Sequence, residues 1–396
     1  MCITWRAMSK RSLRLVAGLL LVAAACSSDS ATTTTDAVPT TSQTTTADTT
    51  TPDTTAQDTT DAQASESEPV EASAPAPVSF AEVEAEYQGA VDEILAAGRQ
   101  TMDQFLADDF EALWERLDAV TAAALSVEDL GAGKAQLILQ APLGERTSDR
   151  AIQLSPSLRV YGAELEWGEE AIAATVSFND EQEISGLTLS PQFPLPNDPS
   201  AGYESEVSFR LPFDGLWFVF WGGDVELQNY HVVAPDQRHA LDLVVWKNGG
   251  THGGDGSANE DYWAYGQRVI APAGGTVVTV VDGLADNVPQ VGSDPVNPAG
   301  NHMVIRVADG DYVLIAHVQA GSLVVSEGDT VQPGQELGRV GNSGNTSEPH
   351  IHIHLQDRPT FDPSATGLPL EFTSYLVNGE MVEKGDPIAD QFVANG

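Results

Sequence analysis

Cysteine is almost absent from the chain. Its 396 residues include two cysteines, Cys2 and Cys26, and both lie near the N-terminus. The folded part after residue 26 therefore has no thiol, which excludes a disulfide or a thiolate zinc site there. Any metal bound by that part must be held by His, Asp or Glu.

Basic residues are also scarce. The chain has 18 Lys and Arg against 58 Asp and Glu, a formal net charge of −40. This charge repels the phosphates of nucleic acids and anionic lipid head groups. Nucleic acid is therefore excluded as a partner, and electrostatic binding to a membrane surface is disfavoured.

Long hydrophobic runs are missing as well. The apolar run at residues 15–25 has 11 residues, too short for a helix that must cross about 30 Å of hydrocarbon. Four basic residues precede it, as in a secretory signal peptide: Arg6, Lys10, Arg11 and Arg14. The sequence Ala23-Ala24-Ala25-Cys26 resembles a bacterial lipobox, which implies lipidation of Cys26. The alternative is ordinary secretion with cleavage near Ala25.

The rest of the chain is expected to comprise a tether and two domains. Residues 27–78 hold 16 Thr and 9 acidic side chains, without Lys, Arg or aromatic residues. Such a segment buries too little surface to offset its chain entropy, so we expect a disordered tether at 26–78. Domains are expected at 79–192 and 193–396. Together, the signal peptide, the lipobox and the tether predict a lipid-anchored protein of the cell envelope that is attached to the membrane only through its N-terminus.

Residues 79–192 are expected to form a small α+β domain. Apolar residues from Phe80 to Val120 recur every three or four positions, which predicts two amphipathic helices. After Gly131 the period approaches two, most clearly at residues 172–178, which predicts strands. The order of elements and the turn at Asn179 resemble nuclear-transport-factor-two-like domains. No histidine lies here, so a spacer or binding module is expected.

All eight histidines lie in the last 166 residues, which directs the search for chemistry to this part. It is rich in short apolar segments separated by Gly, Pro, Asn and Asp, including residues 276–281, 303–307, 312–318 and 322–325. This pattern predicts an all-β antiparallel domain.

The sequence Pro349-His-Ile-His-Ile-His354 is the most informative stretch. On an extended strand residues i, i+2 and i+4 share a face, so His350, His352 and His354 project together while the isoleucines pack behind them. Three aligned imidazoles suit a metal site better than a core. A solvated surface row is the alternative.

Further ligands must come from elsewhere in the chain. Asp242 interrupts the apolar segment 240–245, where an ionised carboxylate would be costly without a cation. Two histidines compete to join it. His239 shares its face only if the strand starts after it, because residues i and i+3 of a strand point to opposite sides. His231 can fold back across the turn that follows it. Spacing slightly favours His231.

Several segments together resemble the lysostaphin-type (LytM) zinc metalloendopeptidases. They are Tyr-Val-Leu-Ile-Ala-His at 312–317, Gly-Arg-Val-Gly-Asn-Ser-Gly-Asn-Thr at 338–346, Pro-His-Ile-His at 349–352, Tyr-Gly-Gln-Arg-Val-Ile-Ala-Pro at 265–272 and Ala-Gly-Asn-His-Met-Val-Ile at 299–305. The resemblance extends from Trp221 to Leu355. It implies a zinc-dependent endopeptidase that cuts stem or bridge peptides of bacterial peptidoglycan.

The resemblance also implies roles for individual residues. It assigns one zinc ion to His231, Asp242 and His352, and it makes His317 and His350 the unligated active-site histidines that move a proton or hold an oxyanion. One departure concerns spacing, since ten residues separate His231 from Asp242 where the family commonly has three.

The remaining histidines are expected outside the ligand set. His354 lies about 6.6 Å beyond His352 at about 3.3 Å per residue, so it should support the site or face the surface. His302 precedes an apolar strand and is expected to be structural, and His252 lies in a Gly-rich loop. A catalytically silent wall-binding or regulatory lipoprotein of the same fold is the alternative function.

Overall fold

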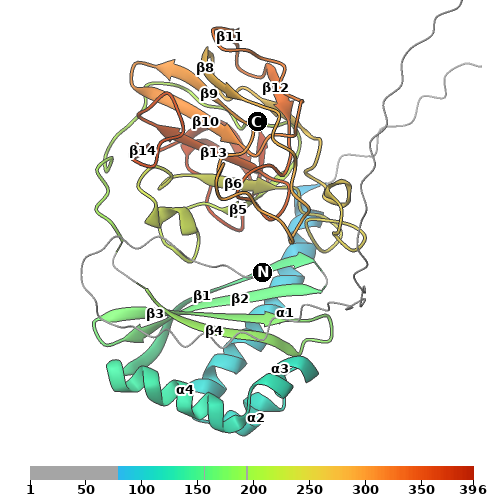
Figure 1. Cartoon of the computed structure of the whole chain (residues 1–396), viewed down its shortest axis with the longest axis vertical. Coiled ribbons are helices and arrows are strands. Elements are labelled where there is room, and N and C mark those ends of the chain that lie inside the picture. The colour runs from blue at the N-terminus through green and yellow to red at the C-terminus, as the bar shows by residue number, and fades with distance from the viewer. Residues whose placement is uncertain (1–78, 156, 193–194) are drawn as a thin grey trace, which may run out of the picture. The chain divides into compact units, whose positions relative to one another are not determined.

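The computed structural model describes residues 79–396 except 156 and 193–194 (Figure 1). The expectations of a signal peptide, of lipidation at Cys26 and of a tether at 26–78 lie outside the described residues. None of the helices within the described part is long and apolar enough to cross a membrane.

Four helices open the described part: α1 (Phe80–Leu106), α2 (Phe110–Trp114), α3 (Ala119–Ala124) and α4 (Val127–Gln140). Helix α1 is capped at its N-terminus by Ser79, whose side chain accepts a hydrogen bond from the backbone N–H of Glu82. The apolar residues predicted to face inward, Val83, Tyr87 and Val91, are buried.

The prediction of two helices followed directly by strands was wrong in two places. Helix α1 ends at Leu106 because Asp108 adopts a left-handed conformation with φ of 60°, and the apolar periodicity continues in short helices. Buried Lys134 stabilises this break by donating to the Leu106 carbonyl and to Asp108, each at 2.7 Å. Gly131 lies inside α4 rather than at the start of the strands.

The strands of this part form one antiparallel sheet in the order β1-β2-β3-β4, with β1 (Leu143–Ser155), β2 (Leu158–Trp167), β3 (Glu170–Phe178) and β4 (Ile184–Gln192). The alternation predicted at residues 172–178 is confirmed, since Ile172, Ala174, Val176 and Phe178 are all buried. The expected α+β composition of this region is therefore confirmed.

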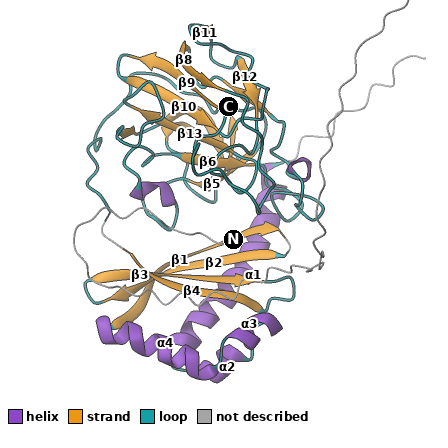
Figure 2. Cartoon of the chain, viewed as in Figure 1, coloured by secondary structure: helices purple, strands orange, loops and turns teal. Residues whose placement is uncertain are grey.

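The C-terminal part is a large antiparallel sheet of 11 strands in the order β11-β8-β9-β10-β13-β6-β5-β17-β15-β16, with β14 paired to β13. The succession from β11 to β5 can be followed in Figure 2. Its strands are β5 (Trp217–Trp221), β6 (Leu241–Val244), β8 (Gly275–Val281), β9 (His302–Ala308), β10 (Asp311–Ala316), β11 (Thr330–Val331), β13 (Ile351–Gln356), β14 (Gly367–Leu368), β15 (Phe372–Val377), β16 (Glu380–Gly385) and β17 (Phe392–Asn395). A second sheet pairs β7 (Arg268–Ile270) with β12 (Glu336–Arg339). The predicted all-β antiparallel fold is confirmed.

Residues 322–325, predicted as a strand, form a loop instead. Val325 is buried and Leu323 packs on the main core, so their apolar character reflects packing rather than pairing in a sheet. The boundary between 79–192 and 193–396 stays a prediction, because one hydrophobic cluster includes residues from both, such as Tyr87 of α1 and Phe218 of β5.

The middle of the large sheet places residues of distant sequence side by side. Strand β13 lies between β10 and β6, and His352 is paired with Ala316 on one side and with Asp242 on the other. Ile351 and Ile353 are at most 1% exposed and belong to the main hydrophobic cluster. The predicted division of β13 into an apolar face and a histidine face is confirmed.

Candidate metal centre

Asp242 of β6 lies at the centre of a group of imidazoles. One carboxylate oxygen, Oδ1, lies 2.8 Å from Nδ1 of His352 and 3.5 Å from Nε2 of His350, and the other, Oδ2, lies 3.7 Å from Nε2 of His231. Asp242 is 5% exposed. Burial acts to raise the pKa of Asp242, but the neighbouring histidines outweigh it and hold this pKa well below its ordinary range. The carboxylate is therefore ionised.

His231 belongs to a short 3-10 helix, η1 (Tyr230–Val233), which begins after Asn229. The Asn229 amide nitrogen donates to the carbonyls of Gly223 at 3.0 Å and Ala240 at 3.1 Å, which fixes the orientation of the amide. Its oxygen must therefore accept from Nδ1–H of His231, 2.8 Å away. Burial lowers the pKa of His231 to about 3, so the ring is neutral and its Nε2 lone pair faces Asp242.

His239, the competing candidate, lies apart from this group. Its Nε2 lies 3.3 Å from Oγ of Ser200 and 3.4 Å from a carboxylate oxygen of Asp198. Of the two clusters of described residues able to hold a metal, one contains His231 and neither contains His239. The fold back across the turn therefore brings His231, rather than His239, beside Asp242.

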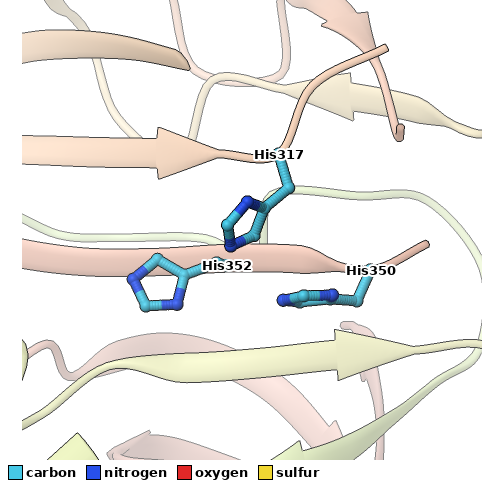
Figure 3. A group of neighbouring side chains, drawn as sticks. All are labelled: His317, His350 and His352. Carbon is cyan, nitrogen blue, oxygen red and sulfur yellow. The ribbon is translucent and has the colours of Figure 1, made fainter. Parts of the chain in front are cut away.

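His317 and His350 line the other side of the group, and their rings point toward His352 (Figure 3). His317 directly follows β10 and has a φ of 60°, a left-handed conformation that is costly outside glycine. Its Nδ1 lies 2.8 Å from the Ser343 carbonyl, and Nδ1 of His350 lies 2.8 Å from the Glu348 carbonyl. A carbonyl can only accept, so both rings carry their proton on Nδ1 and turn Nε2 toward the group.

The two rings differ in their electrostatic environment. Burial lowers the pKa of His317 well below its ordinary value. Burial also acts to lower the pKa of His350, but the charge of Asp242 outweighs it and raises this pKa. The ring centroids of His317 and His350 are 4.8 Å apart, and those of His317 and His352 are 5.7 Å apart.

The donor set fits a zinc ion. The ligand atoms of His231, Asp242 and His352 all lie within 4.8 Å of one another, and so do those of His317, His350 and His352. Two imidazoles and one carboxylate are ligands that Zn²⁺ accepts, and three protein ligands leave a coordination position for water. The first cluster also contains the anion that a buried cation requires.

The three remaining histidines, His252, His302 and His354, belong to neither cluster able to hold a metal within the described residues. His302 is buried, with Nδ1 2.7 Å from the Gly300 carbonyl, and belongs to neither cluster. His252 packs against the ring of Tyr262 at 5.0 Å. His354 is buried with Nδ1 at 2.9 Å from Nε2 of His352, so it supports that ring rather than facing the surface.

Three supporting residues escaped the sequence analysis: Asn229, Gln356 and Tyr230. Asn229 and Gln356 act through hydrogen bonds to histidines two residues away in sequence. Tyr230 is 42% exposed and its ring lies 4.0 Å from that of His231. Their proximity to the histidines was the one available signal, because Asn, Gln and Tyr occur in many other roles.

Comparison with known proteins supports the C-terminal assignment. Residues 261–363, which include strands β7 to β13 of the mostly antiparallel C-terminal part, match the model of Peptidase family M23. The matched residues include His317, His350 and His352. His231 and Asp242 precede the matched residues.

Individual relatives are distant. A stretch of 100 residues is 29% identical to the cell division protein DipM of Caulobacter vibrioides, but covers 25% of this chain and 15% of DipM. The catalytic domain of lysostaphin from Staphylococcus simulans is 16% identical over 41% of this chain and 88% of that domain, with a TM-score of 0.23. The M23 metalloprotease pseudoalterin, of deep-sea origin, is 18% identical over 45% and 96%, with a TM-score of 0.26.

Proposed function

We propose that the protein is a zinc-dependent endopeptidase that hydrolyses peptide bonds in bacterial peptidoglycan. The observation that carries the proposal is the convergence of His231, Asp242 and His352 beside two further imidazoles, those of His317 and His350, whose Nε2 atoms face the group. The match of residues 261–363 to a peptidase family supports it.

His231, Asp242 and His352 would hold one zinc ion per chain. When bound there, zinc would lower the pKa of a water molecule and polarise the scissile carbonyl. Asp242 contributes the negative charge, and His231 contributes Nε2 with its tautomer set by Asn229. His352 contributes Nδ1, the ring nitrogen nearest to Asp242.

His317 and His350 would supply the proton transfer and the hydrogen bonds. Each ring is held by a backbone carbonyl at Nδ1, so Nε2 is the atom that accepts a proton or donates to a developing oxyanion. The carbonyls of Ser343 and Glu348 orient the rings without occupying this atom. A pair of such groups suits peptide hydrolysis, which needs one group at the nucleophile and one at the carbonyl oxygen.

The location and the accessory region follow from the sequence. We infer export to the cell envelope, with a lipid anchor at Cys26 facing the wall. We infer that residues 79–192 are a spacer or binding module, as the resemblance to nuclear-transport-factor-two-like domains implies. Peptidoglycan peptides would be the partners, with no nucleic acid, as the charge of −40 requires.

A catalytically silent protein that binds or regulates the wall is the second candidate. The ten residues between His231 and Asp242, and Leu241 before the aspartate, are the observations that favour it, because this spacing departs from the LytM pattern. A silent protein would bind wall fragments and would not hydrolyse them.

One experiment separates the two candidates. The purified full chain is analysed for zinc and incubated with peptidoglycan, beside His352→Ala and the control His302→Gln. The endopeptidase predicts about one zinc per chain and release of peptide fragments for wild type and control, with both lost in His352→Ala. Hydrolysis by His352→Ala at the wild-type rate, or wild-type hydrolysis that persists after treatment with a chelator, would reject the proposal. Binding without hydrolysis would favour the silent protein.

A further inference from the structure

We propose that Thr251 is a positioning residue that links the end of strand β1 to the segment that holds His350. This inference rests on the proposed function, and it gives residues 79–192 a part in catalysis beyond that of a spacer or binding module. Thr251 is 3% exposed and belongs to neither cluster able to hold a metal within the described residues. It ends a loop, residues 246–251, that packs against β1.

The last residues of β1 are covered on both faces. Residues 151–155 are all buried, whereas a strand with one solvated face alternates between buried and exposed positions. The loop 246–251 supplies part of this cover. The Gln153 amide nitrogen donates to the Gly249 carbonyl at 2.6 Å, and the Trp246 indole nitrogen donates to the Gln153 carbonyl at 2.9 Å. The end of β1 therefore holds this loop at two points.

A glycine lets the loop approach the strand closely. A Cβ at Gly250 would lie 2.7 Å from the Leu154 carbonyl oxygen and 3.0 Å from Cα of Ser155, so a larger residue would force the two backbones apart. The Leu154 carbonyl accepts from the backbone N–H of Thr251 at 3.0 Å, and the Thr251 hydroxyl lies 3.2 Å from the same oxygen. Thr251 is thereby held against β1 through its backbone.

The Thr251 hydroxyl connects this docked loop to the site. Its oxygen lies 3.2 Å from Oε2 of Glu348. Because the backbone N–H of Thr251 already donates to the Leu154 carbonyl, the single hydroxyl hydrogen is available to Glu348. Among the described residues, the Glu348 carboxyl group has no other hydrogen-bond partner. Thr251 therefore orients the Glu348 side chain.

Glu348 in turn holds His350. The Glu348 carbonyl oxygen lies 2.8 Å from Nδ1 of His350 and accepts from the Thr346 hydroxyl at 2.8 Å. Residues 346–350 precede β13, so hydrogen bonds of the sheet do not fix them. A shift of Glu348 would move the carbonyl that sets the orientation of the His350 ring. The link from β1 thus ends at a ring that would move a proton, and none of its members is a ligand of the proposed zinc site.

The same strand also holds the loop on the other side of the site. Arg150 of β1 is 6% exposed and donates to the carbonyls of Phe220 at 2.7 Å and Leu227 at 3.3 Å. It also pairs with Asp390 at 2.8 Å. Leu227 precedes His231 by four residues. Strand β1 therefore supports both sides of the site, as expected of a fixed support rather than a mobile spacer.

The test measures hydrolysis of soluble peptidoglycan fragments by variants of the full chain. Thr251→Val removes the hydroxyl and keeps the backbone hydrogen bond to Leu154. We expect kcat to fall about 10-fold, because a small displacement of a group that moves a proton is costly. KM and zinc content should not change. Thr251→Ser keeps the hydroxyl, and its kcat should stay within about threefold of wild type.

Thr121→Val is the matched control for loss of a buried hydroxyl. Thr121 is also 3% exposed, and its hydroxyl lies 3.2 Å from the Ser185 carbonyl, far in sequence from every histidine. The control should lose a similar part of the free energy of unfolding in urea and keep the wild-type kcat. Equal falls in kcat in Thr121→Val and Thr251→Val would mean that kcat follows stability, and would overturn the inference.

Gly250→Ala tests the β1 end of the link. Its Cβ would push the loop away from Leu154, so kcat should fall while zinc is retained. Gly186→Ala is the control, because its Cβ would lie 3.7 Å from the nearest atoms and should leave kcat unchanged. If Gly250→Ala does not fold, as judged by circular dichroism, Gln153→Met replaces it by removing the donor to the loop. A wild-type kcat in the folded variant would overturn the link to β1.

A second readout needs neither metal nor substrate. In the metal-free protein, the imidazole resonances of His350 should shift in Thr251→Val and stay in place in Thr251→Ser and Thr121→Val.

The outcomes distinguish this inference from the proposed function. If wild type hydrolyses the fragments and folded Thr251→Val does so with the same kcat, the inference is wrong and the proposed function stands. Unshifted His350 resonances in Thr251→Val would also overturn the inference alone. If wild type hydrolyses nothing, the proposed function fails and the inference fails with it, whatever the His350 resonances show.

Discussion

Replacing Asn229 tests how the fold prepares His231 for a metal. The fully buried Asn229 side chain makes four hydrogen bonds, accepting from the backbone and Nδ1 of His231 and donating to the carbonyls of Gly223 and Ala240. Each hydrogen bond contributes about 0.5 to 1.5 kcal/mol, so the loss of all four in Asn229→Ala should lower the free energy of unfolding by about 2 to 6 kcal/mol. It should also weaken zinc binding about 10- to 100-fold, because His231 loses the acceptor that fixes its tautomer.

Asn229→Asp separates the two effects. The carboxylate still accepts from Nδ1–H of His231, as in carboxylate-histidine-zinc arrangements, so zinc affinity should remain within a few-fold of wild type. The variant loses the two hydrogen bonds donated to the carbonyls of Gly223 and Ala240 and keeps the two that it accepts, so the free energy of unfolding should still fall, by at least about 1 to 3 kcal/mol. Urea unfolding of the metal-free chain gives the stability, and chelator competition gives the affinity.

The reasoning would be refuted by either of two results. The first is a folded Asn229→Ala that binds zinc as tightly as wild type, since the acceptor would then be irrelevant to His231. The second is a parallel loss of affinity in Asn229→Asp and Asn229→Ala, which would mean that affinity follows stability rather than the tautomer.

Two further predictions concern Gly300, which lies against the Ser343 carbonyl, and Asp149 of strand β1. Gly300→Ala would place a Cβ 2.2 Å from the Ser343 carbonyl oxygen, which holds His317, at a φ of 57° that favours glycine. We expect a folded but less stable protein with reduced peptidoglycan hydrolysis and unchanged zinc content, and loss of zinc would contradict this. The hydrogen bond from Arg99 outweighs burial and lowers the pKa of Asp149, so its stabilisation should be present above about pH 4 and lost as pH falls through the lowered value. Acid unfolding should show Asp149→Asn to be less stable than wild type at pH 7, with a difference that shrinks as the pH falls below about 4; a constant difference would contradict the assignment.

Periodicity predicted the elements in which one face is buried. The period of two in residues 349–354 predicted a histidine face and an apolar face, and Ile351 and Ile353 are buried as expected. Periodicity failed at residues 322–325, where apolar side chains pack on the core from a loop rather than from the expected strand. It also failed at Asp108, whose left-handed backbone interrupts a helical pattern.

The convergence of distant residues could be predicted only in part. The cost of an ionised Asp242 in an apolar strand indicated a cation partner, but the pairing of β6 with β13 depends on the whole sheet order. The choice between His231 and His239 depended on how one loop folds. Proximity to a histidine was the one sequence signal for Asn229 and Gln356, and it does not give their role, because that role comes from where their amide hydrogens are donated.

The position of the metal tests the central claim most directly. Crystals of the full chain grown with zinc, with anomalous data collected on both sides of the zinc absorption edge, would locate the ion. We predict one peak about 2.0 to 2.2 Å from Nε2 of His231, a carboxylate oxygen of Asp242 and Nδ1 of His352. A peak bound by His317 and His350 instead, or no peak within this group, would contradict it.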